Sequence, residues 1–522
     1  MSGSDQGAGS AGGATVRPPT EWPSADLLAE RASRTPECEA LVAADTGAAW
    51  TYRELHAAVA DLADRLDPLL GDGRLGVLSP TRPAVAQLLF AALRLRAPLV
   101  PLNVRNATED LADQAARADL DALVCTTGTR AMAEGIAPDG CTVVSVDDED
   151  GPAWVDESGG SDETDALPSS PTLGDAPDPD AEALLVFTSG TTGRPKGVRL
   201  TTRNLVASAT ASAFRLGVDR DDRWLVPLPT YHVGGLAPLV RSTLYGTTTV
   251  LGPGGGFDAE TTAEHLADQR STCVSLVPTM LDRLLEFGWR PDDRLRVVLL
   301  GGAPASRDLL DRCAERGVPA WPTYGMSEAS SQVTTAPPET AREHPGTVGQ
   351  PLVNVTLRVL DADGEPCDPG ERGELVADGP QVTSGYLDEE HTDAAFSELG
   401  LHTGDVGYRD ADGRLWVTGR VDDLLVSGGE NVDPNRVARV LRECPGVTDV
   451  AVVGLDDPEW GDRVAALVVG ECSPATFDDY AREHLADHER PRTVAFADAL
   501  PRTASGTVDR DAVRGRLGSD GG

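Results

Sequence analysis

Lysine is almost absent from this chain of 522 residues, which contains 44 arginines and the single lysine Lys196. The chain also lacks any uninterrupted apolar run of about 18 residues, the length that could cross a membrane. Its first 20 residues lack the apolar core of a signal peptide. The eight cysteines are scattered, without the C-x-x-C spacing of a zinc or redox site. We therefore expect a soluble cytoplasmic protein with free thiols and no membrane insertion.

Positive charge is scarce as well, since 84 acidic residues against 45 basic ones give a formal net charge of −39. This charge would repel nucleic acid and anionic membranes, so neither is expected as a partner. The acidic residues would also repel one another. Salt relieves that repulsion, because the Debye length falls from about 8 Å at physiological ionic strength to about 3 Å at 1 M. The composition predicts a halophilic protein; a GC-rich genome that favours Arg, Ala, Gly and Asp codons is the alternative.

The length exceeds the roughly 100 to 200 residues of one domain, which predicts at least two domains. Residues 1–18 are rich in Gly, Ser and Ala and predict a disordered tail. Residues 147–181 are acidic and rich in Pro, Ser and Gly, which predicts a surface insertion or linker. We expect an N-terminal domain over residues 19–420 and a smaller C-terminal domain over residues 421–522.

Helix and strand signals alternate in the N-terminal part. Leu27, Leu28 and Ala32 recur at helical spacing after Ser24, a predicted cap, and Thr51-Tyr-Arg-Glu54 is a capping box that opens a second helix. Six stretches that follow suit buried strands, at residues 75–78, 98–102, 184–187, 272–277, 296–300 and 355–360. A helix-like segment at residues 84–95 lies between the first two of them. This alternation predicts parallel α/β layers.

The single lysine ends a glycine-rich run that follows the strand-like segment at residues 184–187. The run reads Thr188-Ser-Gly-Thr-Thr-Gly-Arg-Pro-Lys196, and its glycines and hydroxyls can bring N–H and O–H donors onto phosphate oxygens. It is not a Walker A loop, because Pro195 stands at the required second glycine and Gly197 follows the lysine. A flexible linker is the alternative, but linkers do not usually follow a buried strand. We predict a phosphate-binding loop.

These residues, with several motifs that follow in order, resemble the adenylate-forming (ANL) superfamily of acyl-CoA and aryl-CoA synthetases. The resemblance covers the chain from about Trp22 to about Arg516. It implies an α/β fold, with a large N-terminal domain of layered lobes, a small β-barrel-like part and a small mobile α+β C-terminal domain. It further implies that ATP and Mg²⁺ are cofactors, that CoA is the cosubstrate, and that a carboxylic acid is joined to AMP before a thiol attacks the acyl-adenylate. A homodimer is left open.

The resemblance also implies functional residues at matching positions. Those for the nucleotide are Thr188, Ser189, Gly190, Thr191, Thr192, Gly193, Lys196, Gly302, Ala303, Tyr324, Gly325, Met326, Ser327, Asp405 and Arg420. In the family pattern Tyr324 packs on adenine and contacts the α-phosphate, and Asp405 and Arg420 bind the ribose. Glu328 helps to bind Mg²⁺ and, with Lys196 and His232, forms the catalytic set. Taken alone, Asp405 would more often be a turn residue and Glu328 a solvated charge.

Acyl and CoA contacts follow from the same resemblance. His232 matches an acyl-pocket motif, where it would gate the pocket or contact the carboxylate, although a lone histidine is as often part of a core. Arg241, nine residues later, suggests a second carboxylate on the substrate, with a surface role as the alternative. Asp422 aligns with the hinge about which the C-terminal domain rotates. Gly428 and Gly429 would leave room for the pantetheine arm of CoA, or simply form a turn.

The C-terminal motif departs from the family. The usual P-R-T-x-S-G-K reads Pro501-Arg-Thr-Ala-Ser-Gly-Thr507, so Thr507 stands where the family has its adenylation lysine. Loss of one charge-stabilising donor typically costs on the order of 10²-fold to 10³-fold in rate. Arg502 or Arg510 would substitute, or Lys196 would carry more of the charge, or adenylation would be slow.

The strings around His232 and Glu328 most resemble the 2-succinylbenzoate–CoA ligases of menaquinone biosynthesis, in which a Ser-Gln pair often follows the glutamate motif, as Ser331-Gln332 does here. Gly234 departs from that subfamily, where Ser is common. The first alternative is a broader aryl-, medium-chain or fatty acyl-CoA ligase. The second is a nucleotide-binding member that has lost adenylation activity, for which Thr507 is the best argument.

Overall fold

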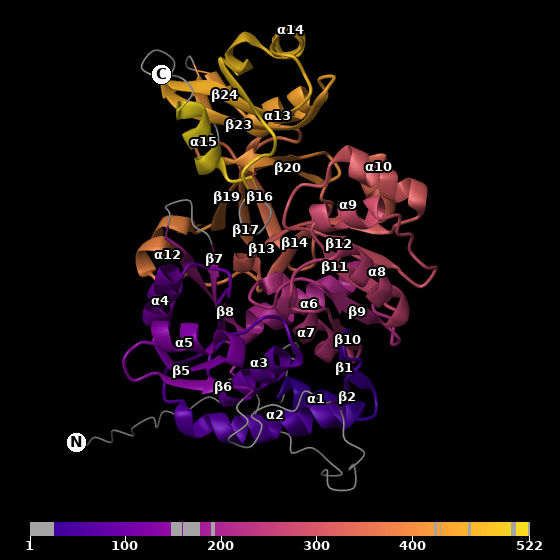
Figure 1. Ribbon diagram of the computed structural model, residues 1–522, viewed down its shortest axis with the longest axis vertical. Helices are drawn as coiled ribbons and strands as arrows, with labels where there is room; N and C mark the ends of the chain where they lie inside the picture. Colours follow the sequence, from indigo (N-terminus) through magenta and orange to yellow (C-terminus); the bar gives the residue numbers. More distant parts are fainter. Residues whose placement is uncertain are drawn as a thin grey trace, which may run out of the picture.

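The computed structural model of the protein describes residues 26–147, 159, 178–188, 194–421, 425–427, 430–457, 461–502 and 508–519. Figure 1 shows these residues running from indigo and magenta α/β layers at one end to a yellow domain at the other. Four sheets organise them.

A six-stranded sheet forms one α/β layer, in the order β6-β5-β3-β4-β7-β8. Its strands are β3 (Arg74–Leu78), β4 (Leu99–Pro101), β5 (Leu120–Cys125), β6 (Thr142–Ser145), β7 (Glu182–Thr188) and β8 (Lys196–Thr201). All neighbours are parallel except β7 and β8, which form an antiparallel pair at the edge. The continuous apolar run of β7 is buried, as expected for a sheet covered on both faces.

A nine-stranded sheet forms the second layer, in the order β15-β14-β13-β12-β11-β9-β10-β1-β2. Its strands are β1 (Glu39–Ala43), β2 (Ala49–Thr51), β9 (Arg223–Val226), β10 (Thr248–Leu251), β11 (Cys273–Leu276), β12 (Val297–Leu300), β13 (Ala320–Met326), β14 (Ser331–Thr335) and β15 (Gln350–Pro351). The central strands are parallel, and β2, β14 and β15 run antiparallel at the two ends. The carboxyl ends of β12 and β13 therefore lie side by side, where ligands commonly bind in α/β proteins.

Helices cover these sheets. They are α1 (Leu27–Arg34), α2 (Tyr52–Leu66), α3 (Pro83–Leu95), α4 (Thr108–Arg117), α5 (Arg130–Ile136), α6 (Thr202–Leu216), α7 (Val233–Tyr245), α8 (Ala259–Asp268), α9 (Pro278–Glu286), α10 (Arg307–Arg316) and α11 (Pro338–Glu343), with the 3₁₀ turns η1 (Asp67–Leu69), η2 (Thr127–Thr129) and η4 (Ser327–Ala329). Helix α3 is buried on every side over its first ten residues, so it reads as apolar throughout. One core cluster includes α3, Leu184 of β7 and Leu251 of β10, and thus joins both sheets.

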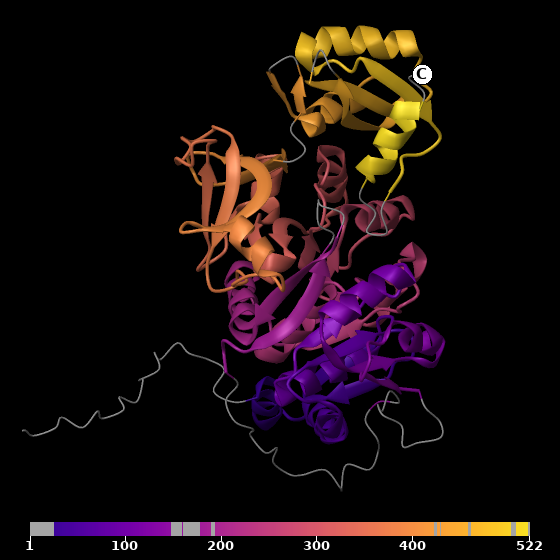
Figure 2. The same ribbon diagram turned by 90° about the vertical axis from the view of Figure 1, so that its left-hand side faces the viewer.

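A smaller, curled antiparallel sheet follows, built from β16 (Thr356–Leu360), β17 (Gly373–Asp378), β18 (Phe396–Ser397), β19 (Gly400–Arg409) and β20 (Leu415–Arg420), with α12 (Glu389–Ala395) before β18. Figure 2 shows this sheet in orange, beside the magenta strands and below the C-terminal domain. Its core includes Val333 of β14, so it packs against the end of the nine-stranded sheet.

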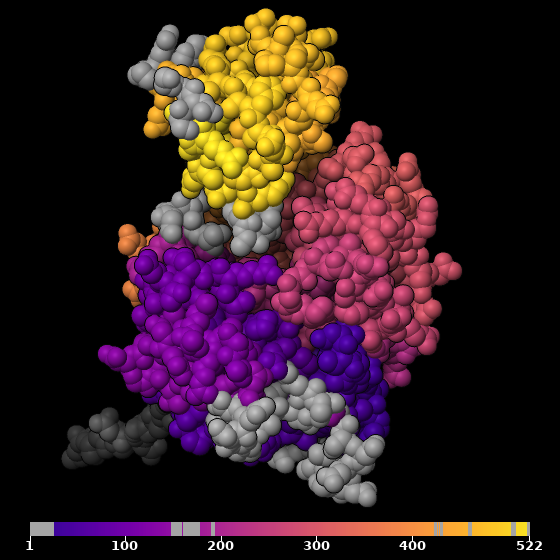
Figure 3. Space-filling view, in the orientation of Figure 1, coloured from indigo at the N-terminus to yellow at the C-terminus, as the bar shows by residue number. Residues whose placement is uncertain are grey.

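The C-terminal domain has its own sheet and core. Its elements are β21 (Leu425–Ser427), β22 (Glu430–Val432), α13 (Pro434–Arg442), β23 (Val447–Asp457), β24 (Gly461–Gly470), α14 (Pro474–His484), η6 (Asp487–Glu489), β25 (Thr493–Ala497) and α15 (Arg510–Ser519). Helix α13 contacts β20, and Arg372 Nη1 lies 3.5 Å from Asp433 Oδ2 across the junction. In the space-filling view this domain, in yellow, lies beyond one end of the α/β layers (Figure 3).

The predicted fold is confirmed: layered α/β lobes, a curled sheet and a small C-terminal domain are all present. The capping box at Thr51 and Glu54 is confirmed. The cap of the first helix was wrong, because the side chain of Asp26 accepts the hydrogen bond from Ala29 N, and Ser24 lies outside the described residues. The domain boundaries, the tail and most of the acidic insertion stay predictions. No helix among the described residues is long and apolar enough to cross a membrane.

Candidate active site

The base of the glycine-rich loop is the β7–β8 pair, in which Thr188 lies directly opposite Lys196. The Thr188 hydroxyl lies 3.5 Å from the carbonyl oxygen of Lys196, which makes a long hydrogen bond. The Lys196 ammonium lies over the ring of Tyr386, with Nζ 5.4 Å from the ring centroid. Ser189, Gly190, Thr191, Thr192 and Gly193 lie outside the described residues. The predicted strand before the loop is confirmed.

A second group brings three predicted residues together. Asp405 of β19 and Arg420 of β20 face each other in the antiparallel register, and Arg420 Nη1 lies 3.3 Å from Asp405 Oδ1. The Tyr324 hydroxyl, from β13, donates a 2.6 Å hydrogen bond to Asp405 Oδ2. Burial and the neighbouring Asp405 carboxylate raise the pKa of Tyr324 well above its usual value. Residues about 80 to 100 positions apart in the chain thus meet between the curled sheet and the nine-stranded sheet.

The segment Gly325-Met326-Ser327-Glu328 turns the chain from β13 through η4 into β14. A side chain at Gly325 would place its Cβ 1.8 Å from the carbonyl oxygen of Ser331, so only glycine fits the close approach of the two strands. The turn presents Glu328, whose Oε1 accepts a 3.0 Å hydrogen bond from the Tyr386 hydroxyl. Glu328 is therefore held by a partner, which argues against a freely solvated charge.

Gly302 and Ala303 follow β12 directly, at the carboxyl end of the parallel strands. Gly302 has φ +79°, a left-handed conformation that glycine adopts without strain. The adjacent strand β13 carries Tyr324, so the two predicted adenine-lining segments lie at the same edge of the sheet.

His232 precedes the first residue of α7, and its ring meets the Tyr231 ring edge-on at a centroid distance of 4.8 Å. The residue is exposed, so the alternative of a satisfied core histidine is wrong. The surrounding protein nevertheless desolvates the imidazole and lowers its pKa.

Arg241 lies inside the protein, with 3% of its surface exposed, so the alternative of a surface role is wrong. Its Nη1 donates 3.2 Å hydrogen bonds to Ser212 Oγ and Gln332 Oε1, and its guanidinium lies 4.2 Å from the centre of the Trp224 ring. Its Nε has no hydrogen-bond partner among the described residues. Burial lowers the pKa of Arg241. Gln332 pairs with Gly325 across β13 and β14, so the hydrogen bond to Gln332 links Arg241 to the Tyr324 motif through one residue.

The remaining predicted positions belong to the C-terminal domain and its junction. Asp422, Gly428, Gly429 and Thr507 lie outside the described residues. Arg502 Nη2 lies 2.7 Å from Asp449 Oδ2 on β23. Arg510 Nη2 donates a 2.6 Å hydrogen bond to Asn435 Oδ1 on α13.

One residue of the site escaped the sequence analysis. Tyr386 contacts both Lys196 and Glu328, although it lies 58 positions from Glu328 in the chain. Burial and the Glu328 carboxylate raise its pKa above the usual value. The only signal in the sequence is a Gly385-Tyr386 pair in a loop, which by itself predicts no more than a turn.

Family profiles match both parts of the chain. A profile described as AMP-binding enzyme matches residues 28–387, and one described as AMP-binding enzyme C-terminal domain matches residues 436–507. The protein therefore belongs to the AMP-binding enzyme family. It is an acid–CoA ligase that forms an acyl-adenylate.

Among its relatives is the 2-succinylbenzoate–CoA ligase of Bacillus pumilus, which is 36% identical over 499 residues, 94% of this chain and 97% of the relative. A solved structure of o-succinylbenzoate CoA synthetase from Bacillus subtilis, in complex with the acyl-adenylate intermediate, superimposes with a TM-score of 0.84 at 33% identity, covering 94% and 98% of the two chains. The same synthetase in complex with ATP and magnesium ion gives a TM-score of 0.83 at 33% identity, with 95% and 99% covered.

Proposed function

We propose that this ligase activates 2-succinylbenzoate with ATP and Mg²⁺ and transfers the acyl group to CoA, in menaquinone biosynthesis. The observation that carries the choice of acid is Arg241, a buried guanidinium with no acidic partner among the described residues. A buried charge without a counter-ion is costly, and a substrate carboxylate would supply one. 2-Succinylbenzoate keeps a second carboxylate on its ring after the first is activated. The Bacillus relatives support the same acid.

The nucleoside would be held where the curled sheet meets β13. The Asp405 carboxylate can accept hydrogen bonds from both ribose hydroxyls, and Arg420 opposite it steadies that carboxylate. The Tyr324 ring would pack on adenine, with Gly302 and Ala303 along the other edge. The hydrogen bond from Tyr324 to Asp405 supports this arrangement, because it joins the ring to the carboxylate proposed to hold the ribose.

The phosphates would lie between the glycine-rich loop and Glu328. Lys196 supplies the only lysine charge of the chain at the base of the loop, with Thr188 opposite and Ser189 to Gly193 as further donors. No group of three or more His, Cys, Asp or Glu that could hold a metal occurs among the described residues. A single carboxylate such as Glu328 suits Mg²⁺, which usually binds through one or two carboxylates together with substrate phosphates. Magnesium bound there would neutralise charge on the leaving pyrophosphate.

In the first half-reaction, a carboxylate oxygen of the acid forms a bond to the α-phosphorus while the bond to the bridging oxygen breaks and pyrophosphate leaves. The protein contributes positioning and charge stabilisation rather than covalent chemistry. Lys196 stabilises charge on the phosphates, and His232, neutral because of its lowered pKa, can donate a hydrogen bond from its N–H group to the carboxylate of the acid. In the second half-reaction, the thiol sulfur of CoA bonds to the acyl carbon, the thiol proton passes to solvent and AMP leaves.

The second half-reaction requires the C-terminal domain to turn, and we place the hinge at Asp422. The contact of α13 with β20 and the Arg372–Asp433 pair are the interactions that such a rotation would exchange. Gly428 and Gly429 would then leave room for the pantetheine arm.

Arg510 is the better candidate to replace the missing lysine. Its partner Asn435 lies against Gly419, where an added Cβ would come within 2.9 Å of Asn435 Nδ2, and Gly419 directly precedes Arg420. Arg510 is therefore linked through one side chain to the strand that carries the ribose contacts. Arg502, in contrast, is paired with Asp449 on β23. An arginine can also present two donors to a phosphate, where a lysine presents a point charge.

A panel of acids tests the substrate, assayed for CoA-dependent AMP formation in molar KCl. It includes 2-succinylbenzoate and 4-oxo-4-phenylbutanoate, which lacks the ring carboxylate. We expect kcat/KM to favour 2-succinylbenzoate by on the order of 10²-fold, because a buried charge would otherwise stay unpaired. Arg241→Met should abolish that preference. Preference for a fatty or simple aryl acid would favour the broader ligase alternative.

Arg241→Met also separates substrate binding from a structural role. Removing an uncompensated buried charge should leave Tm unchanged or raise it, whereas removing a structural arginine should lower it. The alternative of a nucleotide-binding protein without adenylation activity predicts no AMP release with any acid. AMP release that depends on both acid and CoA would contradict that alternative.

A further inference from the structure

A short segment, residues 383–388, lies between the two charged residues proposed to act on ATP. We call it the tie segment. On one side it bonds to β8, since Leu387 N donates 2.7 Å to the carbonyl of Gly197 and Arg199 N donates 3.2 Å to the carbonyl of Gly385. On the other side, Thr383 N donates 2.6 Å to the carbonyl of Glu328. The tie segment therefore holds the strand of Lys196 and the turn of Glu328 in one arrangement.

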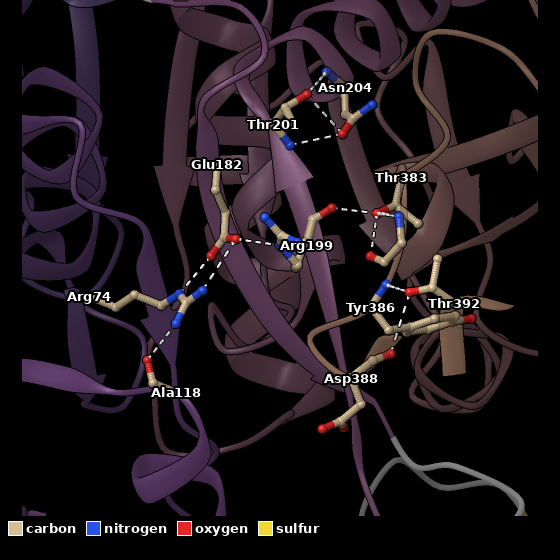
Figure 4. A network of polar contacts seen from close by, with 11 residues as sticks. Arg74, Ala118, Glu182, Arg199, Thr201, Asn204, Thr383, Tyr386, Asp388 and Thr392 are labelled. Carbon is tan, nitrogen blue, oxygen red and sulfur yellow. Dashed lines mark hydrogen bonds and ion pairs between the residues drawn. The ribbon is translucent and has the colours of Figure 1, made fainter. Parts of the chain in front are cut away.

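Figure 4 shows the side chains around this segment. The Thr383 hydroxyl contacts the carbonyl oxygen of Arg199, and the backbone N–H of Tyr386 donates 2.9 Å to Thr392 Oγ1 of α12. Asp388, at the end of the segment, accepts a 2.6 Å hydrogen bond from Arg117 Nη2, while Nη1 of the same arginine donates 2.8 Å to the carbonyl of Pro195. The segment is thus fixed at both ends and at its centre, so the Tyr386 side chain has a defined position.

Tyr386 has two contacts with opposite charges. Its ring face lies under the Lys196 ammonium, and aromatic faces attract cations. Its hydroxyl donates to Glu328 Oε1, which leaves the second carboxylate oxygen for another ligand. Only 6% of the residue's surface is exposed, so water does not compete strongly for either contact.

Lys196 and Glu328 carry opposite charges on two elements that contact each other, β8 and the segment that contains η4. Among the ion pairs that the described residues form, none joins Lys196 to Glu328. A direct pair would use up the positive charge meant for phosphate and the carboxylate meant for Mg²⁺. Tyr386 gives each charge a neutral partner instead, and both remain able to bind a ligand.

We infer that Tyr386 is a positioning residue that holds Lys196 and Glu328 apart and oriented for MgATP. This inference rests on the proposed function of those two residues. It assigns to Tyr386 no contact with the reacting atoms. Its consequence is specific: loss of the hydroxyl should affect the response to Mg²⁺, and loss of the ring should additionally affect ATP binding without metal.

The test uses the full-length protein and measures ATP affinity by calorimetry, with and without Mg²⁺. In Tyr386→Phe, the ring and its contact with Lys196 remain while the hydrogen bond to Glu328 is lost. We expect the improvement of ATP affinity by Mg²⁺ to fall about tenfold, the usual effect of a hydrogen bond to a charged group. ATP affinity without Mg²⁺ should stay within about twofold. In Tyr386→Leu, we expect ATP affinity without Mg²⁺ to fall as well.

Tyr52→Phe is the matched control, because the Tyr52 hydroxyl is also buried and donates to backbone carbonyls, those of Ser242 and Thr247, at 2.9 and 2.6 Å. It should lower Tm and leave the Mg²⁺ response unchanged. If Tyr386→Phe leaves the Mg²⁺ response unchanged, or changes it no more than Tyr52→Phe does, the inference is wrong.

A double-mutant cycle with Glu328→Gln gives a second measurement. The effect of Tyr386→Phe on the Mg²⁺ response should disappear in the Glu328→Gln background, whereas additive effects would contradict the inference. Pyrophosphate exchange with 2-succinylbenzoate, measured in parallel on the wild-type protein, tests the proposed function separately. Absence of exchange would overturn that function while the binding measurements still decide the role of Tyr386.

Discussion

The positive charges near the glycine-rich loop and those near the C-terminal motif are arranged differently. Lys196 has a neutral aromatic ring beneath it and remains available to an anion. In the C-terminal domain, Arg502 is paired with an aspartate and Arg510 is bonded to an amide. The difference supports the proposal that Lys196 binds phosphate. In the C-terminal domain, the hydrogen bond of Arg510 to the Asn435 amide would be easier to exchange for a phosphate than the pairing of Arg502 with the Asp449 carboxylate.

The largest expected effect is at the loop. Lys196→Ala should reduce ATP–pyrophosphate exchange and overall ligation by at least 10²-fold to 10³-fold, the order of magnitude for loss of one charge-stabilising donor. Lys196→Arg, which keeps the charge, serves as the control and should retain more activity. Near-normal exchange by Lys196→Ala would show that arginines carry the phosphate charge and would remove the contrast between the two regions.

A smaller effect is expected from the C-terminal arginines. Arg510→Ala should slow pyrophosphate exchange by about tenfold, because its link through Asn435 brings it near the ribose strand, while Arg502→Ala should change exchange less than twofold. Steady-state exchange rates at saturating ATP measure both. If Arg502→Ala proves the more harmful, the assignment of the stand-in must be reversed. If Arg510 is the stand-in, Thr507→Lys, which restores the family residue, should make Arg510→Ala less damaging.

Salt should change stability in both regions together. With a net charge of −39, repulsion among acidic residues exceeds the loss of screened surface ion pairs, so Tm should rise by a few degrees from about 0.1 M to about 1 M KCl. Differential scanning calorimetry at both salt concentrations provides the measurement. A Tm that falls with salt would favour codon usage over salt adaptation as the source of this composition.

The smallest effect is a pH dependence at His232. Desolvation by the surrounding protein holds the pKa of His232 below the usual 6.5, so the native protein binds fewer protons than the unfolded chain as pH falls through that value. The associated stability is therefore present above about pH 6.5 and lost below it. The contribution of the neutral imidazole to kcat/KM for the acid should likewise persist at and somewhat below pH 6.5. Profiles of kcat/KM for the acid, for the wild-type protein and His232→Gln, test this; identical profiles would show that His232 does not contact the acid.

Parts of the molecule differed in how well the sequence predicted them. The strand at residues 184–187 was predicted correctly, because a short apolar run before a glycine-rich segment is a local pattern. The roles of Lys196 and Glu328 stay predictions. The cap of the first helix was misplaced by two positions, since Asp26 competes with Ser24 for the same role and both residue types suit a cap. The alternative of a surface role for Arg241 was wrong, because sequence spacing does not show what covers the helix that carries it.

The sequence by itself predicted alternating α/β layers and the strand before the loop, from local patterns of apolar residues. The resemblance of its motifs implied the family, which the profiles confirm, and the residues for phosphate, ribose and metal, which stay predictions. Only the tertiary structure decided that Tyr386 stands between Lys196 and Glu328, that Asp405 is held by Tyr324 and Arg420, and that Arg241 is buried without an acid. The reason is that these contacts join residues far apart in the chain, and packing of three separate sheets, which no local pattern encodes, brings them within hydrogen-bond reach.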